Sequence, residues 1–114
     1  MKVIKELAEK CDERERSLLS RMINQAAEYV KAVVVMETAA INIKGLDSEE
    51  WRDARESTDR SRSSAHDAFI SSVNIANRIC DKYGVAHIYT GGEERRCYGD
   101  FAMEIVARIF ENRQ

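Results

Sequence analysis

Residues 45–84 read GLDSEEWRDARESTDRSRSSAHDAFISSVNIANRICDKYG, and no glycine or proline lies between the two terminal glycines. Charged side chains crowd the first half, residues 49–62, whereas apolar side chains recur at helical spacing in the second half, residues 69–83. A single helix of this length would extend roughly 57 Å at about 1.5 Å per residue, about twice the diameter of a small domain. We therefore expect one long helix that ends at Gly84 and is too long for a compact core to enclose.

A second long helix precedes this stretch. From Val3 to Lys44 nothing in the sequence breaks a helix, and apolar residues recur in steps of three and four. Residues 12–17 are almost wholly polar, so a bend or a restart of the helix is expected there. The apolar positions that carry the pattern are Leu19, Met22, Ile23, Ala26, Val30, Val33, Val34, Ala40 and Ile41.

The two helices are predicted to form an antiparallel hairpin. Gly45 is suited to the left-handed conformation that ends a helix, and Asp47 with Glu50 three positions later is typical of a helix start. A tight turn at Gly45 would place Met22 opposite Phe69, Cys11 near Cys80 and Glu37 beside Arg55.

A third, shorter helix is predicted from about Glu94 or Tyr98 to Asn112, and it is long enough to cover only the half of the hairpin near Tyr83. Near the turn, the first helix is apolar nearly all round, from Tyr29 to Ile43. Such a helix must be surrounded, and a second copy of the chain is the simplest cover. We therefore predict one all-α domain over residues 1–114, a long hairpin plus a shorter C-terminal helix, which assembles as a dimeric helical bundle.

Composition excludes several classes of function. The 114 residues carry a net charge of −2, which gives no overall attraction to nucleic acid or to anionic lipid. Three cysteines in no CxxC spacing favour a reducing, cytoplasmic location. No apolar run approaches the ~20 residues that cross a bilayer, so we expect no membrane anchor. The partners that remain are a second copy, another protein or a small anionic ligand.

Glu37 interrupts the apolar stripe of the first helix. A carboxylate at a core position needs a partner, because an unpaired buried charge is costly. Glu37 is then either a metal ligand or general base, or one half of a structural ion pair with Arg55. The second interpretation is the one we favour.

Arg55, Asp59, Arg62 and His66 share one face of the long charged helix, through steps of three, four and seven. Guanidinium groups match the oxygens of a phosphate, so these residues are candidates for binding a small anion. The alternative is a solvated surface joined by pairs of opposite charge along the helix, which is the more common use of such residues.

Arg60 and His66 are separated by five residues in a helical chain that is predicted to dimerise. This pattern resembles the Arg-x4-6-His signature of the higher eukaryote and prokaryote nucleotide-binding ribonucleases. The resemblance implies a metal-independent ribonuclease that uses His66 with Arg60 or Arg62. Within one helix Arg60 lies about 120° from His66, whereas Arg62 shares its face.

Metal-site patterns are absent: there is no Glu-x-x-His pair, and His87 is distant from His66 in the sequence. No nucleophile or phosphate-loop fingerprint is present either. We expect no metal and no cofactor.

Residues 59–74, with residues 77–80, 83–85, 99–102 and 110–113, resemble an uncharacterised bacterial family of small all-helical proteins, a domain of unknown function. The resemblance implies a bacterial, cytosolic, all-helical protein and transfers no activity. The hypothesis that best fits these observations is a non-enzymatic homo-oligomeric protein that binds a partner or a small anionic ligand. The alternative is the metal-independent ribonuclease or another phosphate-handling enzyme with an Arg/His pair.

Overall fold

A computed structural model of the chain describes residues 2–39, 49–90 and 97–112. In these ranges it contains four helices and no strand, in the order α1 (Lys2–Lys10), α2 (Glu13–Ala39), α3 (Glu49–Lys82) and α4 (Tyr98–Asn112). The predicted all-α fold is confirmed. The predicted C-terminal helix is confirmed as well: it begins at Tyr98, the later of the two predicted starts, and ends at Asn112.

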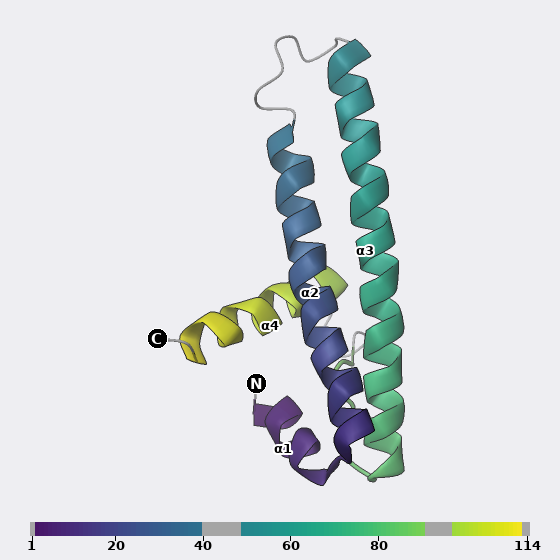
Figure 1. Cartoon of the computed structure of the whole chain (residues 1–114), viewed down its shortest axis with the longest axis vertical. Helices are drawn as coiled ribbons and strands as arrows, with labels where there is room; N and C mark the ends of the chain where they lie inside the picture. Colours follow the sequence, from purple (N-terminus) through teal and green to yellow (C-terminus); the bar gives the residue numbers. More distant parts are fainter. Residues whose placement is uncertain (1, 40–48, 91–96, 113–114) are drawn as a thin grey trace.

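Two long antiparallel helices, α2 and α3, lie side by side along the length of the molecule (Figure 1). The short α4 crosses α2 near its middle, and α1 folds back at the end where α2 begins and α3 ends (Figure 1). The molecule measures 53 × 31 × 27 Å along its principal axes. As predicted, only α2 and α3 are present in the described part of the hinge end.

The expected single helix from Val3 is instead two helices, and the break falls at the start of the polar stretch. The backbone N–H of Glu15 donates to Oδ1 of Asp12 at 2.8 Å, while the N–H of Asp12 donates to Oε1 of Glu15 at 3.0 Å. This reciprocal pair is a capping box, which satisfies two donors that a helix start leaves open. Asp12 therefore begins α2 anew, and the chain turns before it.

Glu15 also fastens the start of α2 to the end of α3. Lys82 Nζ donates to Glu15 Oε2 at 2.8 Å, and the Tyr83 hydroxyl donates to Oε1 at 2.5 Å. Glu15 is buried, and these bonds hold its pKa at about 2, well below the ordinary 4.5, with the Lys82 bond as the main cause. The same bond raises the pKa of Lys82.

Gly84 ends α3 in the left-handed conformation, with φ of 64°. The N–H of Val85 donates to the carbonyl of Cys80 at 3.0 Å, and the N–H of Gly84 donates to that of Asp81 at 3.2 Å. These two bonds form a Schellman motif, which satisfies the open carbonyls at a helix end. Asn77 then fixes the following loop, since its side chain bonds the backbones of Ile88 at 3.0 Å and Tyr89 at 3.2 Å.

Replacing Gly84 by alanine is expected to destabilise the protein by about 1 kcal/mol, because a Cβ is disfavoured at positive φ. A Cβ at Gly84 would meet nothing within 4 Å, so the cost is conformational and not steric. Urea unfolding followed by circular dichroism measures it. Gly99→Ala is the matched control: Gly99 lies inside α4 and a Cβ there makes ordinary contacts of 3.6 and 3.7 Å, so we expect no loss of stability. A Gly84→Ala variant with the same free energy of unfolding as the natural protein would contradict this account of the helix end.

The register of the hairpin differs from the prediction by about one helical turn. The Tyr29 ring lies 5.2 Å from that of His66, whereas the predicted register places Tyr29 opposite Arg62. The described helices end at Ala39 and begin at Glu49, and α3 begins beyond the end of α2 (Figure 1). A tight turn at Gly45 would have required the two helices to end at the same level at the hinge. They do not, because α3 extends further than α2. Gly45 and Asp47 themselves lie outside the described residues.

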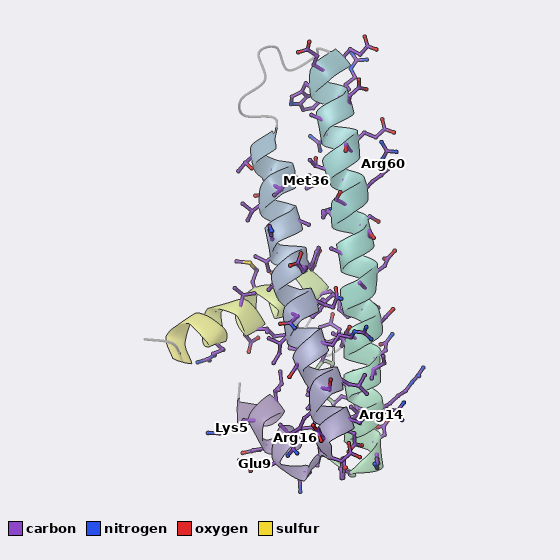
Figure 2. The ribbon with its side chains drawn as sticks, viewed as in Figure 1. Lys5, Glu9, Arg14, Arg16, Met36 and Arg60 are labelled. Atoms are coloured by element: carbon purple, nitrogen blue, oxygen red, sulfur yellow. The ribbon has the colours of Figure 1, made fainter. Side chains whose placement is uncertain are left out.

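One hydrophobic core occupies the part of the molecule away from the hinge and contains residues of all four helices. Met22 and Phe69, the pair predicted to face each other, are both fully buried in it. The hydrophobic core does not extend to the hinge. Near the hinge Met36 lies on the α3 side of α2 (Figure 2), whereas the side chains of Val34 and Val35 are 51% and 46% exposed. No helix in the described ranges is both long and apolar enough to cross a membrane.

Candidate functional site

Aromatic side chains from three helices and from the loop before α4 gather where α4 crosses the hairpin. Phe69 of α3 lies at the centre, with the rings of Tyr29, Tyr98 and Phe101 at 6.2, 6.3 and 5.9 Å. Tyr89, in the loop before α4, lies 4.4 Å from Tyr98. These separations are those of favourable aromatic pairs. The cluster therefore holds α4 at a fixed angle to α2 and α3.

His66 lies at the edge of this aromatic cluster, between two tyrosines. Its ring meets Tyr29 at 5.2 Å and Tyr98 at 6.0 Å, in both cases edge to face. Its side chain remains 31% exposed, and Nδ1 lies 3.4 Å from Oδ1 of the exposed Asp67. His66 is thus held in one orientation and is still reachable from solvent.

Arg62 lies one turn before His66 and is bound to its neighbour on α3. Its Nε donates to Oδ1 of Asp59 at 2.9 Å, and this bond is the main reason why the pKa of Arg62 is raised; the Tyr29 phenol is a lesser hydrogen-bonding partner. The Arg62 charge is therefore already balanced by Asp59. With Asp67 beside His66, the two carboxylates here outnumber the one permanent cation, so the local charge does not favour an incoming anion.

Arg55 does not join Arg62 in one pocket. Its guanidinium lies over the Trp51 ring, 5.4 Å from the centroid, at the charged end of α3. It borders a shallow groove of about 290 Å³ lined by Trp51, Arg52, Arg55, Glu56 and Asp59. Asp59 is the residue that this groove shares with the Arg62 site.

The predicted buried ion pair between Glu37 and Arg55 is wrong. Glu37 is exposed on α2, and no ion pair of this residue is found in the described part of the chain. The cause is the shifted register, together with the absence of α4 at this level, which leaves the outer side of α2 open to water. Glu37 therefore needs no buried partner.

Arg60 and His66 are not brought together within one chain. Arg60 is exposed on the upper part of α3 (Figure 2) and lines an open groove of about 530 Å³ to which His66 does not contribute. Arg62 and His66, by contrast, both approach Tyr29. The other residues that line the Arg60 groove are Gln25, Glu28, Ser61, Ser64, Ala65 and Ala68.

A small apolar pocket opens in the angle between α2 and α4, and we call it the α2–α4 notch. It has a volume of about 230 Å³ and is lined by Tyr29, Val30, Val33, Gly99, Asp100 and Met103. Met103 is 57% exposed. Sequence reasoning missed this site and the two tyrosines beside His66. The apolar spacing marked Val30 and Val33 as helix-face residues, but no local signal gives the angle at which α4 crosses α2.

The fold and the site together define a class: an all-α protein built on a long helical hairpin that a C-terminal helix crosses over an aromatic cluster. In the described residues, no group of three or more His, Cys, Asp or Glu side chains is placed to hold a metal ion. The chain belongs to the family described as Protein of unknown function (DUF3232), whose model matches residues 1–114. The predicted membership of a family of unknown function is thus confirmed. A comparison with curated proteins finds no match, and neither does a comparison with solved structures.

Proposed function

We propose that the protein is a non-enzymatic helical protein that works as a homodimer, and that the partner it binds is a second copy of the chain. The observation that carries this proposal is the set of large apolar side chains exposed on α2 and α4: Val34, Val35 and Met103. Leaving such side chains in water forfeits roughly 1.5–3 kcal/mol each, relative to full burial. We place the dimer in a reducing cytoplasm, because Cys97 is an exposed free thiol.

The shape of the chain supports a dimer. It exposes 8000 Å², whereas a compact monomer of 13.0 kDa exposes about 6,300 Å². Its radius of gyration is 16.7 Å, against about 13 Å for a compact domain of this length. A stable interface buries about 800 Å² on each partner. The surplus surface is therefore large enough to supply one.

The ribonuclease alternative has less support. It needs an arginine and a histidine that face one phosphate, and the arginine that shares the His66 face, Arg62, is bound to Asp59. Arg60 lines a different groove. The same balance of charge disfavours a small anion as the ligand. The geometry supports assembly better than phosphate chemistry.

Sedimentation equilibrium at micromolar concentration tests the proposal. We expect a mass twice the 13.0 kDa of one chain, falling toward the monomer mass only on strong dilution. Measurement at two salt concentrations checks the nature of the contact, since an apolar interface loses little affinity as salt rises. A monomer at tens of micromolar would overturn the proposal.

A further inference from the structure

The hinge half of α2 is the part of the molecule that its own chain leaves least covered. From Val34 to Ala39 it has α3 on one side, while α4 crosses below this level (Figure 1). Val34 is 51% exposed, and Val30, one turn earlier on the same face, lines the α2–α4 notch. An apolar strip of Val30 and Val34 therefore leads out of the notch by one turn toward the hinge, and the exposed, polar Glu37 and Thr38 follow it on the same face.

The exposed side of α4 carries the matching feature. Met103 forms one wall of the notch and is 57% exposed, so the recess and a protruding apolar side chain belong to the same patch. A two-fold symmetric interface requires this kind of self-complementary surface, because the same residues face each other from both sides. Methionine suits such a contact, since its flexible side chain fills irregular gaps.

Resting on the proposed homodimer, we infer that the α2–α4 notch is its interface. The two-fold axis passes near Val34 and reverses the direction of α2, so that α4 of each copy covers the bare hinge half of the other copy's α2. Met103 of each copy then contacts Val34 of the other. Each chain supplies the cover that the other lacks.

The charges around the strip agree with this arrangement. Lys31 and Glu37 lie three residues before and after Val34 and are both exposed. Reversing α2 about Val34 brings Lys31 of one copy to the level of Glu37 of the other. Charges of opposite sign are therefore brought to the same level, and like charges are kept apart, as complementary interfaces require.

Three substitutions measured by sedimentation equilibrium test the inference: Met103→Asp, Val34→Asp and the matched control Val35→Asp. Val35 is a valine of similar exposure, 46%, but lies 100° round α2 from Val34 and on the side away from Val30. Met103→Asp and Val34→Asp each place two carboxylates, one from each copy, in the proposed interface. We expect their dissociation constants to rise about 100-fold or more, and that of Val35→Asp to change less than about 3-fold.

Because all three positions are exposed, the helical circular dichroism spectrum should remain that of the natural protein. If Met103→Asp fails to fold, Val34→Asp decides the question. Loss of the dimer in Val35→Asp, with an intact dimer in Met103→Asp and Val34→Asp, would overturn the inference and leave the homodimer standing. Equal weakening in all three variants would also overturn it. A monomeric natural protein would overturn both proposals.

Discussion

Replacing Phe69 by alanine is expected to lower the free energy of unfolding by about 3–5 kcal/mol, because the change removes a whole ring from a closed core. Phe69 is fully buried, and its ring is surrounded by Tyr29 of α2 and by Tyr98 and Phe101 of α4, all within 6.3 Å. The loss would consume a large part of the 5–15 kcal/mol that stabilises a typical domain. Urea unfolding at fixed protein concentration measures it.

Ile70→Ala provides the control for Phe69→Ala. Ile70 is the next residue on α3, is half-buried, and lies 100° away from the aromatic cluster. We expect a cost of about 1–2 kcal/mol, since less apolar surface is lost and the site is partly open to water. Equal costs at the two positions would show that the aromatic cluster is not the centre of the core. The near-ultraviolet circular dichroism signal should fall in Phe69→Ala alone, because only that change frees the tyrosine rings.

The positions of the helices could be predicted because their signals are local. The absence of breakers between Gly45 and Gly84, and the left-handed glycine that follows Tyr83, depend on neighbours in the chain and not on the rest of the fold. The same holds for the buried stripe that contains Phe69. Asp12 shows the limit of local signals: its capping box with Glu15 lies inside an unbroken helical pattern, so only the polar stretch hinted at a restart.

The register of α2 against α3 could not be derived in the same way. The predicted register assumed a tight turn at Gly45, and no residue in the sequence of the two helices contradicts such a turn. In the structure the contacts of Glu15 with Lys82 and of Tyr29 with His66 place α3 about one turn further along. A helix tolerates such a shift because residues four apart present the same face. Because the register is shifted, the predicted ion pair between Glu37 and Arg55 does not form.

The candidate site was half predictable. Helical spacing correctly placed Asp59, Arg62 and His66 on one face of α3, and the Asp59–Arg62 bond follows from their separation of three. The tyrosines that hold His66 come from α2 and α4, far away in the sequence. The approach of Tyr29 depends on the register of α2 against α3, and that of Tyr98 on the crossing angle of α4, which side-chain packing sets. Spacing along one helix contains no information about that angle.

Acid is expected to weaken the natural protein through Glu15. The bond to Lys82, and then that to Tyr83, hold the pKa of Glu15 at about 2 in the folded state, against an ordinary 4.5. Between these two values the unfolded chain binds a proton that the folded chain does not, so stability falls as the pH falls. The contribution of Glu15 is complete above about pH 4.5 and is lost as the pH approaches 2.

Glu15→Gln isolates this contribution, because the amide keeps an oxygen for the Asp12 N–H and the Tyr83 hydroxyl but has no charge for Lys82 and does not titrate. At pH 6 the variant should unfold at a lower urea concentration than the natural protein, and the difference should vanish near pH 2. Glu13→Gln, an exposed glutamate in the same turn, removes the same charge and should shift the midpoint little. A difference between Glu15→Gln and the natural protein that stays constant from pH 6 to pH 2 would mean that hydrogen bonding alone, without the Lys82 charge, joins the start of α2 to the end of α3.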